Sequence, residues 1–158
     1  MYRIGQGVDF HQLAEGRELW LGGVLIPHHK GAIGHSDADV LLHAICDAML
    51  GALALGDIGK HFPDTDNTYK GIDSKVLLQR CYALIHDKGY SVVNIDSTLL
   101  LQAPKIGPYI EQMQLAIASI LDLTKDEVSI KATTTETLSF IGREEGVVAT
   151  ASVLLQKF

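Results

Sequence analysis

An aspartate and a histidine lie two residues apart near the start of the sequence, at Asp9 and His11. If this segment is a strand, alternation puts both side chains on one face and those of Val8 and Phe10 on the other. A carboxylate and an imidazole are two of the three protein ligands of a typical catalytic zinc site. His43 is the best candidate for the third ligand. The alternatives are a solvated strand face for the pair and, for His43, a core histidine bonded to a carbonyl.

A second segment suits an anion such as a phosphate. His35 and Ser36 begin a turn that is expected to lead into the N-terminus of a helix, where free amides and the helix dipole favour negative charge. His35 could donate to a phosphate oxygen there. The alternative is a capped helix with an exposed histidine, in which Asp37 and Asp39 only complement the dipole.

Several later turns offer further polar groups, each with an ordinary structural alternative. Three consecutive threonines precede Glu136, whose carboxylate is the kind of ligand that magnesium takes beside substrate phosphates; the alternative is a strand end followed by a helical turn. Arg143 suits a phosphate, although a turn with a paired glutamate is the favoured interpretation. The acidic turns at 56–59 and 62–66 suit sugar hydroxyls or Asx turns. Residues 102–107 present backbone groups to a ligand base, or simply connect a strand to a helix.

The elements that must position these residues follow from hydrophobic periodicity. The sequence predicts three helices, one opening at Ser36 with Asp39 completing a capping box, and two at 74–87 and 108–121. Strands are predicted at 2–13, 18–26 (interrupted at Gly22-Gly23), 92–101, 128–134 and 147–155. This order indicates an α+β fold, a mixed sheet with helices packed on one face, in a single domain over residues 1–158.

Composition excludes several classes of protein. The chain has 158 residues, a formal net charge of −6, 47% hydrophobic residues and 20% charged residues, which is typical of a globular protein. The acidic balance argues against nucleic-acid binding. Two cysteines cannot form a disulfide framework, and no apolar run approaches a membrane span or a signal peptide. We therefore expect a cytoplasmic protein with no membrane partner. No motif for a nucleophilic residue is present.

Taken together and in this order, six motifs resemble the 2-C-methyl-D-erythritol 2,4-cyclodiphosphate synthase family across essentially the full chain. They are Asp9-Phe10-His11, His35-Ser36-Asp37-Ala38-Asp39, Ala54-Leu55-Gly56-Asp57-Ile58-Gly59, Phe62-Pro63-Asp64-Thr65-Asp66, Gln102-Ala103-Pro104-Lys105 and Lys131-Ala132-Thr133-Thr134-Thr135-Glu136. The departures are few: Ala38 replaces a usual glycine, Asn67 a common proline, and Gln12 a frequent arginine. None of them removes a candidate ligand.

The resemblance implies a homotrimer with its active sites between subunits. It implies zinc on Asp9, His11 and His43, with magnesium or manganese near Glu136, and it gives His35 and Thr134 catalytic roles. Substrate positions on the metal side, besides Asp9, His11 and His35, are Ser36, Asp57, Gly59, Phe62, Asp64 and Asp66. Positions on the cytidine side, from the neighbouring subunit, are Leu101, Ala103, Pro104, Lys105, Ile106, Gly107, Thr133, Thr134, Thr135 and Glu136. Phe140 and Arg143 match further substrate positions.

The implied reaction is a cyclisation in the non-mevalonate isoprenoid pathway. A phosphate of 4-diphosphocytidyl-2-C-methyl-D-erythritol 2-phosphate attacks the diphosphate of the same molecule and releases cytidine monophosphate. Metals and oriented donors supply charge neutralisation and alignment, and no protein nucleophile is needed. Arg143 and Glu145 also match positions near a central trimer cavity that can hold an isoprenoid diphosphate. A non-catalytic trimer that binds such a ligand is the main alternative, and a metal-dependent phosphoesterase is a third possibility.

Overall fold

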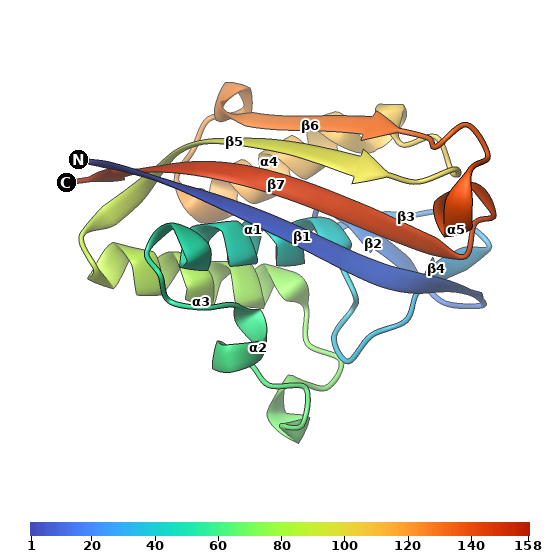
Figure 1. Cartoon of the computed structure of the whole chain (residues 1–158), viewed down its shortest axis with the longest axis horizontal. Coiled ribbons are helices and arrows are strands. Elements are labelled where there is room, and N and C mark those ends of the chain that lie inside the picture. Colours follow the sequence, from blue (N-terminus) through green and yellow to red (C-terminus); the bar gives the residue numbers. More distant parts are fainter.

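A five-stranded mixed sheet forms the framework of the protein, and its helices lie against one face (Figure 1). The computed structural model describes all 158 residues. The strand order is β4-β1-β7-β5-β6; β5 and β6 run parallel and the other neighbours are antiparallel. The strands are β1 (Tyr2–Glu15), β4 (Lys30–Ala32), β5 (Tyr90–Leu100), β6 (Val128–Thr133) and β7 (Gly146–Lys157). The predicted α+β class and the mixed sheet are therefore confirmed.

Three long helices cover the sheet, and shorter ones lie in the connections. The long helices are α1 (Val40–Ala52), α3 (Ser74–Asp87) and α4 (Ile110–Leu121), and the short ones are α2 (Ile58–His61) and α5 (Ser139–Gly142). Eleven of the thirteen residues of α1 are buried, so this helix occupies the centre of the core, with β1 and β7 on one side and α3 on the other. Both cysteines are buried and free, as predicted. None of the helices has the length and apolar character needed to cross a membrane.

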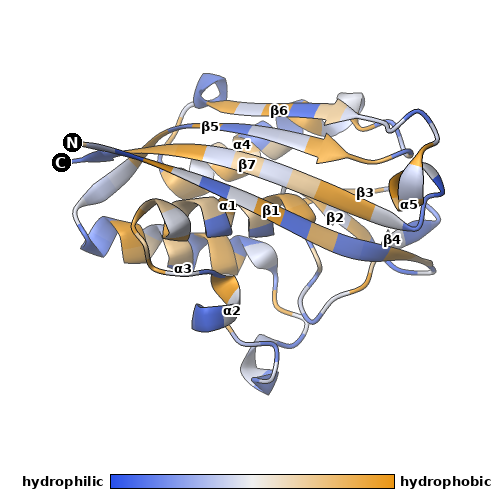
Figure 2. Cartoon of the chain, in the orientation of Figure 1, coloured by the Kyte–Doolittle hydropathy of each residue, from blue (hydrophilic) through white to orange (hydrophobic).

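Strand β1 separates two kinds of surface by alternation of its side chains, and Figure 2 shows apolar and polar residues following one another along its ribbon. Its odd-numbered residues face the helices, and Gly5 and Gly7 are buried there. Its even-numbered residues face away, and Ile4, Val8 and Phe10 remain 77%, 46% and 58% exposed. One face of the strand thus holds the helix layer, while the other presents an uncovered apolar row.

The two buried glycines bring α1 unusually close to β1. A Cβ atom on Gly5 would overlap the backbone carbonyl of Ala48, and one on Gly7 would overlap that of Ala44. The helix therefore lies directly on the strand backbone with no side chain between them. This contact sets the height of α1 above the sheet, and with it the position of every side chain in the first turns of the helix.

The start of α1 differs from the prediction. The N-cap is Asp39, whose carboxylate accepts from Leu42 N at 3.1 Å, so the helix begins at Val40 and Ser36 lies outside it. The same carboxylate is fully buried and accepts from Gly22 N at 2.9 Å and Gly23 N at 2.7 Å. These tertiary bonds, which a local capping box would not use, explain why Asp39 takes the cap instead of Ser36.

The segment predicted as one strand over 18–26 is instead a hairpin of β2 (Leu19–Leu21) and β3 (Val24–Ile26). Gly22 and Gly23 both have positive φ and form its turn, so the expected interruption is a complete reversal. Two further short elements lie in segments for which no helix or strand is predicted: the edge strand β4 after this hairpin and the helix α2 after α1. These elements are three or four residues long, too short for a periodic pattern to identify.

Substituting Gly7 by alanine should destabilise the protein by about 3 kcal/mol, because the new methyl group meets backbone that cannot move aside. The matched control is Gly51→Ala on the same helix, where a Cβ has ordinary contacts and alanine is the better helix former; it should raise stability by up to about 1 kcal/mol. Urea unfolding measures both. A Gly7→Ala protein as stable as the unsubstituted one would contradict the proposed contact.

Candidate metal centre and substrate pocket

Asp9, His11 and His43 meet at one point below the sheet. Asp9 Oδ2 lies 2.9 Å from His11 Nε2 and 3.2 Å from His43 Nδ1, and the two nitrogens are 3.2 Å apart. The alternation of β1 places the first two side chains on the helix face, and the close packing of α1 brings the first turn of that helix to them. The three residues form the only cluster of potential metal ligands in the protein. The fold therefore assembles the predicted triad.

The imidazole of His11 is oriented by the main chain. Its Nδ1 lies 3.0 Å from the carbonyl oxygen of Ile33, which can only accept, so Nδ1 carries the proton. In the neutral ring the other nitrogen, Nε2, then carries a lone pair directed at Asp9. The backbone carbonyl thus selects the tautomer that suits metal binding.

The imidazole of His43 is held from its other edge. Its Nε2 lies 2.8 Å from Ser74 Oγ and 3.2 Å from Ser36 Oγ, which leaves Nδ1 toward the centre. With Nε2 of His43 protonated, the lone pairs of His11 Nε2 and His43 Nδ1 and the carboxylate of Asp9 point at one another within hydrogen-bonding distance. A divalent cation between them would stabilise this arrangement. The donor set of two nitrogens and one oxygen suits zinc with an open fourth position.

The charges of the cluster reinforce one another. Burial opposes ionisation of Asp9, but the hydrogen bonds and charges of His11 and His43 outweigh it and lower the pKa of this carboxyl. Burial likewise disfavours the charged form of His11, but Asp9 and the Ile33 carbonyl outweigh it and raise the pKa of the imidazole. Without a metal, the site thus holds a carboxylate and a readily protonated histidine.

A cavity of about 490 Å³ opens beside the triad and includes much of the predicted metal-side substrate site. Five of the predicted substrate residues line it: His35, Ser36, Gly59, Phe62 and Asp64. An apolar part of its wall is not identified from the sequence; it consists of Ile58, Tyr69, Ile72 and Leu77. These residues lie in the loop around α2 and at the start of α3, and only the tertiary fold shows that they share a pocket.

Two predicted substrate residues, Asp57 and Asp66, form hydrogen bonds within the loop around α2. The Asp57 carboxylate caps α2 by accepting from Lys60 N at 3.0 Å, and that of Asp66 accepts from Thr68 N at 2.9 Å. His35 Nε2 donates to the Asp66 carbonyl at 3.1 Å, which ties the turn before α1 to this loop. Neither aspartate is among the residues that line the cavity.

The predicted cytidine-side residues gather elsewhere, at the ends of β5 and β6. A second cavity of about 420 Å³ is lined by Leu101, Pro104, Lys105, Ile106, Gly107, Thr133 and Thr134, among others. Figure 1 shows β6 and α2 on opposite sides of the molecule, so the two groups of predicted substrate residues do not meet within one chain. Each group lines a cavity of its own.

The remaining predicted residues lie in the exposed segment after β6. Glu136 and Thr137 have positive φ, a backbone conformation that is unfavourable for residues other than glycine. Glu136 is not among the residues of the metal cluster. Arg143 Nε pairs with Glu145 Oε1 at 2.7 Å, which is the turn favoured from the sequence. Phe140 packs on Phe10 with ring centroids 6.2 Å apart, beside the uncovered sheet face.

Metal binding should depend on pH in a defined direction. Because the pKa of His11 is raised above 6.5, a proton competes for Nε2 at higher pH than at an ordinary histidine. Zinc should therefore raise the melting temperature most in alkaline buffer, and the effect should shrink as the pH falls through this raised pKa. The metal-free protein behaves oppositely, because the stabilisation from charged His11 is present below pH 6.5 and is lost as the pH rises through the raised pKa.

Thermal unfolding with and without Zn²⁺ across the neutral range measures both trends. His86 is the matched control residue, since it ends α3 far from the cluster; His86→Gln should leave the profile of the zinc-induced shift unchanged. A zinc-induced shift that is independent of pH would contradict ligation by His11.

Comparison with known proteins gives relatives over nearly the whole chain. A protein of Shouchella clausii (strain KSM-K16) named 2-C-methyl-D-erythritol 2,4-cyclodiphosphate synthase is 60% identical over 157 residues, 99% of each chain. A protein of Bacillus cereus (strain B4264) with the same name is 57% identical over 157 residues, again 99% of each chain.

Solved structures agree with these relatives. The bifunctional IspDF of Campylobacter jejuni matches with a TM-score of 0.96 and 44% identity, covering all of this chain and 43% of that one. A 2C-methyl-D-erythritol-2,4-cyclodiphosphate synthase structure described as a CDP-bound form matches with a TM-score of 0.90 and 40% identity, covering 98% and 100%. A model of the YgbB family matches residues 2–156. Together with the metal cluster and its pocket, these matches establish that the chain belongs to the YgbB family.

Proposed function

We propose that this protein converts 4-diphosphocytidyl-2-C-methyl-D-erythritol 2-phosphate to 2-C-methyl-D-erythritol 2,4-cyclodiphosphate with release of cytidine monophosphate. The 2-phosphate attacks the phosphorus nearer the methylerythritol, a new P–O–P bond forms, and the bond to the cytidine monophosphate breaks. The observation that carries this proposal is the triad of Asp9, His11 and His43 at the mouth of a pocket, in a chain 60% identical to a named synthase over 99% of its length.

Asp9, His11 and His43 are proposed to hold zinc. Their two lone-pair nitrogens and one carboxylate fit this ion, which when bound supplies positive charge to the reacting phosphates. Glu136 is proposed to hold magnesium or manganese with the substrate diphosphate, since a carboxylate oxygen suits those ions. His43 is buried and Asp9 and His11 are half-buried, which restricts the motion of the three side chains before a metal binds.

The residues of the 490 Å³ cavity are proposed to bind the methylerythritol part of the substrate. His35 and Ser36, at the turn before α1, line this cavity and are proposed to lie beside the phosphate oxygens, to which the Ser36 hydroxyl can donate. Gly59, Phe62 and Asp64 also line this cavity, and Asp57 and Asp66 keep the loop in shape through their caps. Aligning two anionic groups of one substrate molecule is the main task of such a site.

The cytidine side is proposed to come from a neighbouring copy in a homotrimer. The half-site at Leu101–Gly107 and Thr133–Glu136, with Thr134 as its catalytic residue, cannot reach the metal side of its own chain. The apolar row of Ile4, Val8 and Phe10 offers a surface that a second copy would cover. We carry over from the resemblance the binding of an isoprenoid diphosphate in the central cavity, near Arg143 and Glu145, and the assignment of Phe140 and Arg143 as further substrate positions.

Phosphorus NMR of the cytidine diphosphate substrate, with zinc-loaded protein and magnesium, tests the activity. We expect signals of a cyclic diphosphate and cytidine monophosphate from the unsubstituted protein. His43→Ala should lose at least about 100-fold in rate, because it removes a ligand at the reacting centre. Hydrolysis products without the cyclic diphosphate would indicate a phosphoesterase, and unchanged substrate would leave ligand binding without catalysis; either result contradicts the proposal.

Mixing two inactive variants tests the shared active site. His43→Ala destroys the metal side and Thr134→Ala the cytidine side, so each homotrimer should be inactive. Co-refolded trimers should recover about a quarter of the unsubstituted activity, because some sites combine two intact halves. A mixture that stays as inactive as its parents would show that each site belongs to one chain.

A further inference from the structure

The carboxylate of Asp37 lies behind His43, on the side away from the metal cluster, and the proposed reaction gives it no task. It accepts from Ser74 N at 3.0 Å and from Ser74 Oγ in a short hydrogen bond. It also accepts from Asp39 N at 3.2 Å. Asp37 therefore faces only donors, and Ser74, which is fully buried, connects it to His43 Nε2 at 2.8 Å.

The direction of this chain of hydrogen bonds follows from counting protons. A serine hydroxyl has one proton, and that of Ser74 is donated to Asp37, since a carboxylate can only accept. Ser74 Oγ can therefore only accept from His43, so Nε2 must carry the imidazole proton. Nδ1 is then left with its lone pair at the point where Asp9 and His11 converge.

We propose that Asp37, acting through Ser74, is a positioning residue that fixes the metal-binding tautomer of His43. The Asp37 carboxylate fixes the direction of the hydrogen bonds, because it accepts the Ser74 hydroxyl proton. The Ser74 oxygen then accepts from His43 Nε2, and the imidazole presents Nδ1 to the metal. Ser36 cannot replace this function, because its hydroxyl lies farther from Nε2, at 3.2 Å, and is free to donate or accept. The inference rests on the proposed metal site.

Asp37→Asn is the informative substitution, because it keeps the shape and reverses the polarity. One carboxylate oxygen is replaced by an NH₂ group. If this group faced Ser74 N, two donors would oppose each other at 3.0 Å. The amide therefore turns its NH₂ toward Ser74 Oγ and gives up the longer contact with Asp39 N. The Ser74 hydroxyl then donates to His43 Nε2, which moves the imidazole proton onto Nδ1 and blocks the ligand position.

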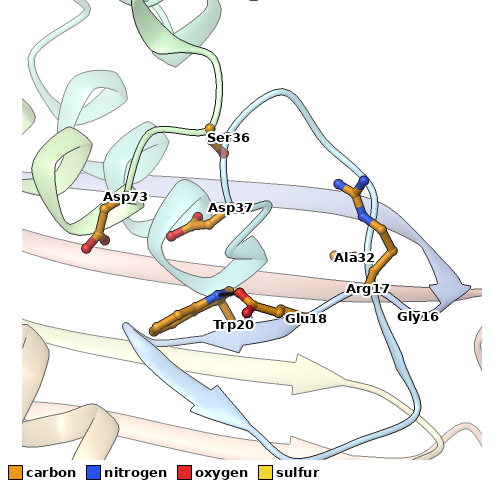
Figure 3. A pocket seen from close by; sticks show the side chains of 9 residues that line it. Gly16, Arg17, Glu18, Trp20, Ala32, Ser36, Asp37 and Asp73 are labelled. Atoms are coloured by element: carbon orange, nitrogen blue, oxygen red, sulfur yellow. Dashed lines mark hydrogen bonds between the residues drawn. The ribbon is translucent and has the colours of Figure 1, made fainter.

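Zinc affinity measured by competition with a chelator should fall about 10- to 100-fold in Asp37→Asn. Removing the Ser74 hydroxyl, which in Asp37→Asn donates to His43 Nε2, should restore part of the zinc affinity. The double variant Asp37→Asn with Ser74→Ala should therefore bind zinc more tightly than Asp37→Asn alone. The matched control is Asp73→Asn, since Asp73 lines the same surface pocket as Asp37 (Figure 3). Its carboxylate caps α3 through Lys75 N and makes no hydrogen bond to His43 or Ser74. Asp73→Asn should change zinc affinity less than about twofold, because asparagine caps as well as aspartate.

Nitrogen-15 NMR of the metal-free, unsubstituted protein provides a test without any variant. We expect His43 as the Nε2–H tautomer, and a proton on Nδ1 alone would overturn the inference. A double variant weaker than Asp37→Asn, or an Asp37→Asn protein that binds zinc normally, would also overturn it. If instead the unsubstituted protein bound zinc no better than His43→Ala does, the metal site itself would be refuted.

Discussion

The close contact between α1 and β1 is the constraint on which the rest of the structure depends. Gly5 and Gly7 leave nothing between the helix and the strand backbone, so the height of α1 is set by main-chain atoms. Side chains at such an interface would repack after substitution, but backbone cannot. Since His43 lies in the first turn of this helix, its distance from Asp9 and His11 is fixed by the framework instead of by flexible side chains.

The two imidazoles of the metal cluster are oriented by hydrogen-bond partners outside it. Each imidazole has one nitrogen held by an outer partner, the Ile33 carbonyl for His11 and Ser74 for His43, and both partners lie away from the centre. The inner nitrogens are thereby both turned toward Asp9. Ligands already in position lose less conformational entropy on binding a metal, which is the physical reason that outer partners influence affinity.

The sequence predicted those features that depend on short-range patterns. Alternation identified β1, and with it the common face of Asp9 and His11, and helical spacing identified α3 and α4. The cap of α1 was assigned to Ser36 instead of Asp39, because the bonds that decide it come from Gly22 and Gly23, remote in the sequence. For the same reason no local signal links Ser74 to His43, although the two are hydrogen-bonded. The metal triad needed the fold to bring its third member close.

The alternation of β1 has a consequence for how this sequence can change. The strand directs Asp9 and His11 to one face and Val8 and Phe10 to the other, so a single residue inserted or deleted between Gly7 and Asp9, with the glycines still held against α1, would exchange the two sets. The ligands would then lie on the open face, and apolar side chains would enter the metal cluster. The number of residues between the buried glycines and the ligand pair is therefore constrained as strictly as their identities.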